Sequence, residues 1–329
     1  MEAKGLFNVA KKEFVDHLAS KRFILILVLF LIISAYSMHE GIGDYNNRLE
    51  DYKEQLSQVE EGELRYMLSE KPSILFIFQR MTMPMMILGA ILAIIMGFDL
   101  ITREKGSRSL KSLLSHPVYR DEIINGKALG GFLVLVFAIG IAFIISFAIL
   151  LLFSIVPNMD DFARVMLFWA VTVLFILTYF SIALMASTIS KDSGRSLMYA
   201  LIITLVLSLG VPVVGEILSE SVVGEPPEPP AVPQYEEWQR YEEESRAYCG
   251  QQEVTKDAVN TFAPWYNYLA VSFVVLYGTT GEIVGPGVVY ATSGQDVLEK
   301  VWKNIFALII LPVVFFAIAY IKFMRLDIR

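Results

Sequence analysis

The sequence contains few residues of the types that disulfide scaffolds and metal centres require. Its 329 residues include one cysteine, Cys249, and three histidines. A single thiol excludes an internal disulfide and a cysteine-based metal cluster. The histidines, His17, His39 and His116, are scattered, no HExxH zinc helix is present, and none of the three lies in a long apolar segment. We therefore interpret them as surface residues and predict no metal site.

Motifs for phosphate binding and for nucleophilic catalysis are also missing. Gly126-Lys127 is followed by Ala128, and Asp121 occupies the place of the first glycine of a Walker-A loop. No nucleophile with a nearby base is recognisable. The basic residues form no stripe of the kind that nucleic-acid-binding proteins carry. We expect no catalytic site, no cofactor bound by this chain and no nucleic-acid partner.

Charged residues are scarce, at 19% of the chain, and hydrophobic types make up 55%. A soluble domain is nearer to about 45–50% apolar and about 25% charged. The apolar surplus lies in six long blocks that are nearly free of Asp, Glu, Lys and Arg. This distribution excludes an ordinary soluble enzyme and a disordered chain, and it indicates an integral membrane protein.

The block pattern predicts an all-α integral membrane protein with six transmembrane helices. A span needs about 20 apolar residues. The predicted spans are 23–38, 81–98, 128–156, 165–189, 196–217 and 302–323. Around them we expect an amphipathic N-terminal interfacial helix at 1–22, an enlarged outer helical segment at 39–79, a cytoplasmic coupling loop with a coupling helix at 99–127, an enlarged outer region with re-entrant or surface helices at 219–300 and a cytoplasmic tail at 324–329.

The distribution of charge between the spans predicts the orientation. Basic residues gather in 1–22, 99–127, 191–195 and the C-terminal tail, whereas acidic residues gather in 39–79 and 219–300. Positively charged loops stay in the cytoplasm. We therefore expect a multi-pass protein of the cell (plasma) membrane with both termini cytoplasmic. The N-terminal helix suits the membrane surface, and a solvated helix is the alternative.

The second span, 81–98, carries two recognisable patterns. Gly89, Ala93 and Gly97 are four residues apart and therefore share one helix face. Rows of small residues let helices approach closely in lipid, so we predict a packing face. Four methionines between Met81 and Met86 offer thioethers that suit copper(I). Methionine is also a common filler of apolar cores, which is the simpler interpretation.

The span interiors lack the ionisable residues that ion-coupled carriers use. Acidic residues approach the spans only at their ends, at Asp99 and Glu216. Buried carboxylates and histidines in a membrane are costly and usually mark a proton or ion pathway. If this chain transports a substrate, the energy must therefore come from another subunit.

The loop at 99–127 is the most informative segment. Leu110, Leu113 and Leu114 form one apolar side of a short helix, and Pro117 then turns the chain. Such a helix, ringed by arginine and lysine, suits docking of a soluble partner. Its leucines could equally rest on the membrane surface, and residue chemistry alone leaves both interpretations open.

In this segment the sequence resembles the type-2 permease subunits of ABC transporters. The family's first cytoplasmic loop carries a glutamate, a leucine pair, Ser-x-Pro, an arginine, an acidic-isoleucine step and Gly-Lys. The matching residues here are Glu104, Leu110, Leu113, Leu114, Ser115, Pro117, Arg120, Glu122, Ile123, Gly126 and Lys127. The family's usual Gly-Thr pair is replaced by Arg108-Ser109.

The resemblance implies an exporter permease that works with a separate ABC ATP-binding subunit. ATP and magnesium would be held by that subunit, and this chain would pair with a second copy or a paralogue to move a substrate outward. The implied docking residues are Glu104, Arg108, Ser109, Leu110, Leu113, Leu114, Pro117, Arg120 and Lys127. The main alternative is a non-transporting membrane scaffold or mechanotransmission subunit that also works with an ATPase. An autonomous carrier or membrane enzyme is a third interpretation.

Overall fold

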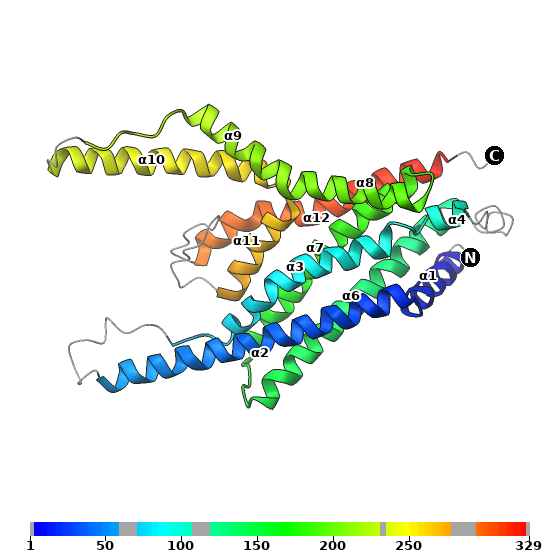
Figure 1. Cartoon of the computed structure of the whole chain (residues 1–329), viewed down its shortest axis with the longest axis horizontal. Coiled ribbons are helices and arrows are strands. Elements are labelled where there is room, and N and C mark those ends of the chain that lie inside the picture. Colours follow the sequence, from blue (N-terminus) through cyan, green and yellow to red (C-terminus); the bar gives the residue numbers. More distant parts are fainter. Residues whose placement is uncertain (1–2, 59–70, 107–118, 231–234, 278–293, 327–329) are drawn as a thin grey trace.

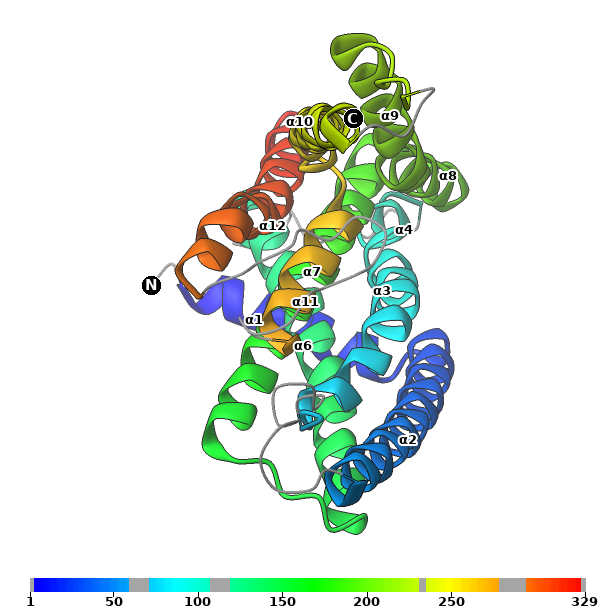
Figure 2. The same ribbon diagram turned by 90° about the vertical axis from the view of Figure 1, so that its left-hand side faces the viewer.

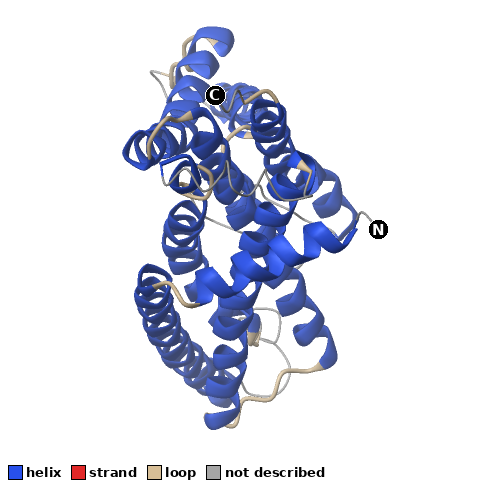
Figure 3. Cartoon of the chain, turned by 90° about the vertical axis from the view of Figure 1, so that its right-hand side faces the viewer, coloured by secondary structure: helices blue, strands red, loops and turns tan. Residues whose placement is uncertain are grey.

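The computed structural model describes residues 3–58, 71–106, 119–230, 235–277 and 294–326. Within these ranges every regular element is a helix, as Figure 3 shows. Six of the helical segments in this described part are long and apolar enough to cross a membrane, which confirms the predicted all-α membrane fold. The helices are α1 (Ala3–Leu18), α2 (Lys21–Gln58), α3 (Leu75–Gly97), α4 (Thr102–Gly106), α6 (Arg120–Leu152), α7 (Met159–Ile189), α8 (Ser193–Leu205), the π-helical turn η2 (Val206–Gly210), α9 (Val211–Val223), α10 (Tyr235–Asn260), α11 (Pro264–Tyr277) and α12 (Gly294–Met324).

The helices form an elongated bundle whose two ends differ in character (Figure 1). Both chain termini, α1 and α4 lie at one end, which we call the terminal end. The far part of α2 and the paired helices α9 and α10 project from the other end, which we call the distal end. The described ends of the predicted coupling loop therefore lie at the terminal end, and the extended helices lie at the distal end.

Helix α7 forms the centre of the bundle, as the view along the bundle in Figure 2 shows. It contacts α3, α6, α8, α11 and α12. Several of its large apolar residues, including Phe168, Phe175 and Ile176, are fully buried. Its polar side chains bond to neighbouring helices: Thr172 Oγ1 lies 3.1 Å from Tyr268 Oη of α11. Because α7 contacts five other helices and its second half is almost entirely buried, it forms the centre of the core.

Small residues on α3 allow a close approach to α7. A Cβ added at Gly97 would lie 2.7 Å from Cβ of Ala183 and 2.9 Å from the backbone oxygen of Phe180. A Cβ at Gly89 would lie 2.6 Å from Cδ1 of Ile176. The side of α3 that carries the small-residue row therefore faces α7.

Several helices extend beyond the apolar segments that the sequence marks. Helix α2 continues without a break from the first predicted span to Gln58, and α6 already begins at Arg120, inside the expected coupling loop. Hydropathy locates the part of a helix that crosses lipid. It does not locate the helix ends, because Glu, Lys, Gln and Leu are good helix formers in water as well.

In the described part of the expected outer region at 219–300, α10 is a surface helix and α11 is inserted into the bundle. Helix α10 packs against α9, and Gly224 turns the chain between them with φ +85°. Helix α11 packs on α3, α7 and α12, with Tyr268 fully buried. Its 14 residues cover about 21 Å, which is shorter than a hydrocarbon core of about 30 Å. These described residues alone are therefore too few to cross the bilayer.

Candidate coupling site at the terminal end

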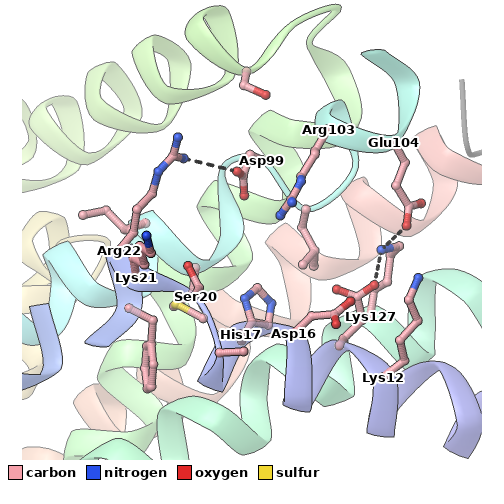
Figure 4. A pocket seen from close by; sticks show the side chains of 17 residues that line it. Lys12, Asp16, His17, Ser20, Lys21, Arg22, Asp99, Arg103, Glu104 and Lys127 are labelled. Carbon is pink, nitrogen blue, oxygen red and sulfur yellow. Dashed lines mark hydrogen bonds and ion pairs between the residues drawn. The ribbon is translucent and has the colours of Figure 1, made fainter. Parts of the chain in front are cut away.

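A cavity of about 810 Å³ lies at the terminal end, among α1, α2, α3, α4 and α6. Figure 4 shows charged side chains from several of these helices around it. The charged residues that line it are Lys12, Glu13, Asp16, Lys21, Arg22, Asp99, Arg103, Glu104 and Lys127. The cavity is thus the place where the N-terminal helix, the start of the coupling loop and a transmembrane helix meet.

The inner wall of the cavity is a buried ion cluster centred on Lys127 of α6. Lys127 Nζ lies 2.5 Å from Glu13 Oε1 of α1 and 2.7 Å from Glu104 Oε1 of α4. The side chain of Lys127 is only 2% exposed. A buried ammonium is tolerated only when it is paired with opposite charge at good geometry. The lysine therefore ties three helices together at one point, and we call these three residues the Lys127 triad.

Glycines on α6 bring α1 close enough for the triad to form. A Cβ at Gly126 would lie 2.7 Å from Cβ of Val9, and one at Gly130 would lie 2.7 Å from the backbone oxygen of Ala10. Helix α6 begins with a capping arrangement in which the backbone N–H of Tyr119 donates to Glu122 Oε2 at 3.0 Å. The start of α6 is therefore fixed both by its own cap and by α1.

The first end of the coupling loop is anchored to the end of α7. Lys105 of α4 donates from Nζ to the backbone oxygens of Thr188 at 2.7 Å and Ser190 at 3.0 Å. The backbone N–H groups of Ile101 and Thr102 donate to Ser187 Oγ at 2.9 and 3.1 Å. The last carbonyls of a helix lack partners within the helix, so a lysine here both bonds them and complements the helix dipole. Any displacement of α4 must therefore pull on α7.

The second end of the loop is anchored to the end of α12. Arg120 Nη1 donates to the backbone oxygens of Leu326 at 3.0 Å and Met324 at 3.3 Å. The chain between these anchors, 107–118, lies outside the described residues. Six of the predicted docking residues belong to it, namely Arg108, Ser109, Leu110, Leu113, Leu114 and Pro117.

The described docking candidates lie at the two ends of the loop. Glu104 and Lys127 face each other in the buried triad, and Arg120 contacts the C-terminal segment. Sequence reasoning missed Glu13, which is 114 positions away from its partner Lys127. A local sequence pattern cannot predict a pair of residues that are so far apart along the chain. Sequence reasoning also missed the anchoring role of Lys105.

His17 of α1 also lines the cavity. Burial lowers the pKa of His17, although the carboxylates of Glu13 and Asp99 oppose this shift. Its Nε2 atom is buried and has no hydrogen-bond partner among the described residues. Since burial penalises the charged imidazolium, His17 favours the neutral form.

The structure gives two methionines of the Met81–Met86 cluster a packing role, whereas Met83 is exposed. Met81 and Met85 are fully buried in the core, and Met81 Sδ accepts a hydrogen bond from Ser146 Oγ at 3.3 Å. In the described part of the chain, no group of three His, Cys, Asp or Glu side chains gathers closely enough to hold a metal ion.

Six helices of the described part are long and apolar enough to cross a membrane, which defines a multi-pass membrane protein. The chain belongs to the ABC-2 family of transporter proteins, because the model of that family matches residues 7–328. Comparison with curated proteins returned no match. The family assignment confirms the resemblance to ABC transporter permeases that the loop residues carry.

Proposed function

We propose that this protein is the permease subunit of an ABC transporter and that it moves a substrate outward with energy from ATP hydrolysed on a separate subunit. The observation that supports this most directly is the anchoring of the loop at 99–127. Its first end is fixed to α6 and α1 by the Lys127 triad and to α7 by Lys105. A loop held at both ends by charged contacts is suited to receive force from a docked ATPase.

The terminal end faces the cytoplasm in this proposal, and the membrane is the plasma membrane. The segments at this end carry most of the basic residues of the short loops. Basic residues in short loops favour the cytoplasmic side. Both termini and the docking loop would then lie where ATP is available.

In the proposed mechanism the ATPase engages 107–118 and displaces α4. Glu104 passes the displacement to Lys127, and therefore to α6 and α1. Lys105 passes it to the end of α7, which contacts five other helices of the bundle. Because packed helices move as rigid bodies, a small shift at this end can change the packing of the spans.

In this proposal, ATP hydrolysis and the substrate path belong to different subunits. ATP and magnesium would be bound by the ATPase, and this chain would supply only the path. A second permease copy or a paralogue would complete that path. The second copy would need an exposed apolar surface to pack against, and α8–α9 offers one. Only 6% of the most apolar 18-residue stretch of α8–α9 is buried, against 61% for the span that contains α3.

Co-purification tests the proposal directly. The tagged full-length chain is isolated in mild detergent from its native membranes, and the associated proteins are identified. We expect an ABC ATPase in the wild-type sample and none when Leu113 and Leu114 are both replaced by aspartate. The matched control is Leu56→Asp, an exposed leucine on the far part of α2, and it should retain the ATPase. A well-folded wild-type chain that arrives alone would overturn the proposal.

A non-transporting scaffold or mechanotransmission subunit remains the second candidate. The long extension of α2 and the polar helix α10 at the distal end favour it, because they extend beyond the apolar spans (Figure 1). Reconstitution of the permease and its ATPase in vesicles separates the two. ATP-dependent conformational change without flux of any substrate supports the scaffold, whereas ATP-dependent flux supports the permease.

A further inference from the structure

The terminal-end cavity contains basic side chains that the coupling contacts do not use. Arg22 lies 3.5 Å from Asp99, and Lys127 belongs to the buried triad. Lys12, Lys21 and Arg103 also line the cavity, and none of these three forms an ion pair with any described residue. The cavity therefore presents three cationic groups that have no anionic partner within the described protein.

The acidic residues of the cavity balance only part of this charge, since five cations and four carboxylates line it. Glu13 and Glu104 are both paired with Lys127, and Asp99 is paired with Arg22. Asp16 is the one lining carboxylate outside these pairs. The free positive charge comes from different helices, since Lys12 lies on α1 and Arg103 on α4, and Figure 4 shows the two side chains on opposite sides of the cavity. An anion between them would therefore be held from both sides.

The position of the cavity points to an amphipathic ligand. The apolar part of α2 starts at Phe23, directly after Lys21 and Arg22, and the apolar part of α3 ends just before Asp99. Phe23, Ile95, Met96 and Leu100 contribute apolar surface to the same cavity. The site thus combines cations with apolar side chains at the point where the apolar parts of two spans end.

We propose that this cavity binds the phosphate group of an anionic phospholipid, with Lys12 and Arg103 as the principal contacts and Lys21 as a third. Guanidinium and ammonium groups are the side chains that bind phosphate best, and arginine does so through two parallel hydrogen bonds. The apolar side chains favour a lipid over a soluble phosphate compound as the source of that group. If the terminal end faces the cytoplasm, this lipid belongs to the cytoplasmic leaflet. Only that assignment of the leaflet rests on the proposed function.

Native mass spectrometry of the purified full-length chain tests the site without the ATPase. The protein is delipidated in detergent and titrated with phosphatidylglycerol or with phosphatidylcholine, and inorganic pyrophosphate serves as the soluble probe. We expect retention of phosphatidylglycerol in preference to phosphatidylcholine. A basic residue near an anionic surface contributes about 1 kcal/mol, which corresponds to a roughly fivefold loss of affinity for Lys12→Gln or Arg103→Gln and a roughly 25-fold loss for the double variant.

Lys11→Gln is the matched control, because Lys11 is the exposed neighbour of Lys12 on the same helix and does not line the cavity. It should bind phosphatidylglycerol as the wild type does, and Lys12→Arg should retain most of the affinity. An equal loss in Lys11→Gln and Lys12→Gln would overturn the proposal in favour of general surface attraction. Equal retention of the two lipids would also overturn it. If there is no lipid preference but pyrophosphate binds in a way that depends on Lys12, the site would belong to a soluble phosphate compound instead. None of these results depends on ATPase docking, so the two proposals fail separately.

Discussion

Lys127 Nζ of α6 lies 2.7 Å from Glu104 Oε1 of α4, and the lysine side chain is 2% exposed. Glu104 precedes the chain that the sequence marks as the docking segment, and Lys127 lies on a helix that continues through the membrane. The same ammonium also holds Glu13 of the N-terminal helix. One buried group therefore connects the loop, a span and the N-terminal helix, and its removal should affect all three.

Replacement of Lys127 by methionine should lower the stability of the fold strongly. The substitution retains the volume of the side chain but leaves Glu13 and Glu104 buried without their cation. Loss of one partner from a buried ion cluster costs about 3–5 kcal/mol. The free energy of unfolding in detergent, from denaturant titration, measures the effect.

The control for this variant is Arg246→Met, which breaks an exposed pair with Glu242 whose side chains are 82% and 61% exposed. Exposed pairs contribute about 0–1 kcal/mol, so this variant should remain close to the wild type. Equal stability of the Lys127→Met and Arg246→Met proteins would contradict the burial of the triad.

Replacement of Gly97 by alanine should loosen the contact between α3 and α7. The added Cβ would lie 2.9 Å from the backbone oxygen of Phe180, and backbone cannot move aside as a flexible side chain can. Overpacking of this kind costs about 1–3 kcal/mol. Gly140→Ala is the control, since its Cβ would meet nothing within 4 Å. The thermal unfolding midpoint should fall for Gly97→Ala and stay level or rise for Gly140→Ala, and the reverse order would contradict the helix contact.

Two asparagines should contribute unequally to the attachment of α11. Asn304 of α12 donates one hydrogen bond to Asn267 Oδ1 at 2.8 Å, and Asn267 also donates to the backbone oxygens of Thr261 at 2.7 Å and Ala263 at 3.0 Å. Asn304→Ala should cost about 1–3 kcal/mol, because it leaves one buried acceptor without its donor. Asn267→Ala removes all three bonds and should cost more. Unfolding measurements on both variants test the order, and a larger loss for Asn304→Ala would contradict it.

The burial of His17 predicts a dependence of stability on pH. Because burial lowers the pKa of His17 in the folded protein below its ordinary value of 6.5, the unfolded chain binds the proton more readily. Stability should therefore be complete above pH 6.5 and decrease as the pH falls below that value towards the lowered pKa of the folded state.

The thermal unfolding midpoint measured between about pH 5 and pH 8 checks this dependence, a range that brackets the ordinary histidine pKa. His17→Gln should flatten the profile on the acidic side. His39→Gln, at an exposed position on α2, should retain the wild-type profile. A profile that is unchanged by His17→Gln would show that other groups cause the dependence.

The amino-acid sequence by itself determined the class of fold, the number of spans and the family. Six apolar blocks specify six membrane-crossing helices, because a chain in lipid must satisfy its backbone hydrogen bonds internally and a helix does so locally. The loop residues from Glu104 to Lys127 carried the family resemblance without any knowledge of contacts. Such information is local, and a local pattern can be read along the chain.

The tertiary structure alone decided which charges meet and which helix is enclosed. Glu13, Glu104 and Lys127 come from three helices, and nothing in their neighbourhoods along the chain distinguishes them from charges that face water. Helix α11 carries polar residues, yet its contacts with α7 and α12 bury Asn267 and Tyr268 completely. Pairing and enclosure depend on distances between segments that are far apart in the sequence, and those distances exist only after the helices have packed.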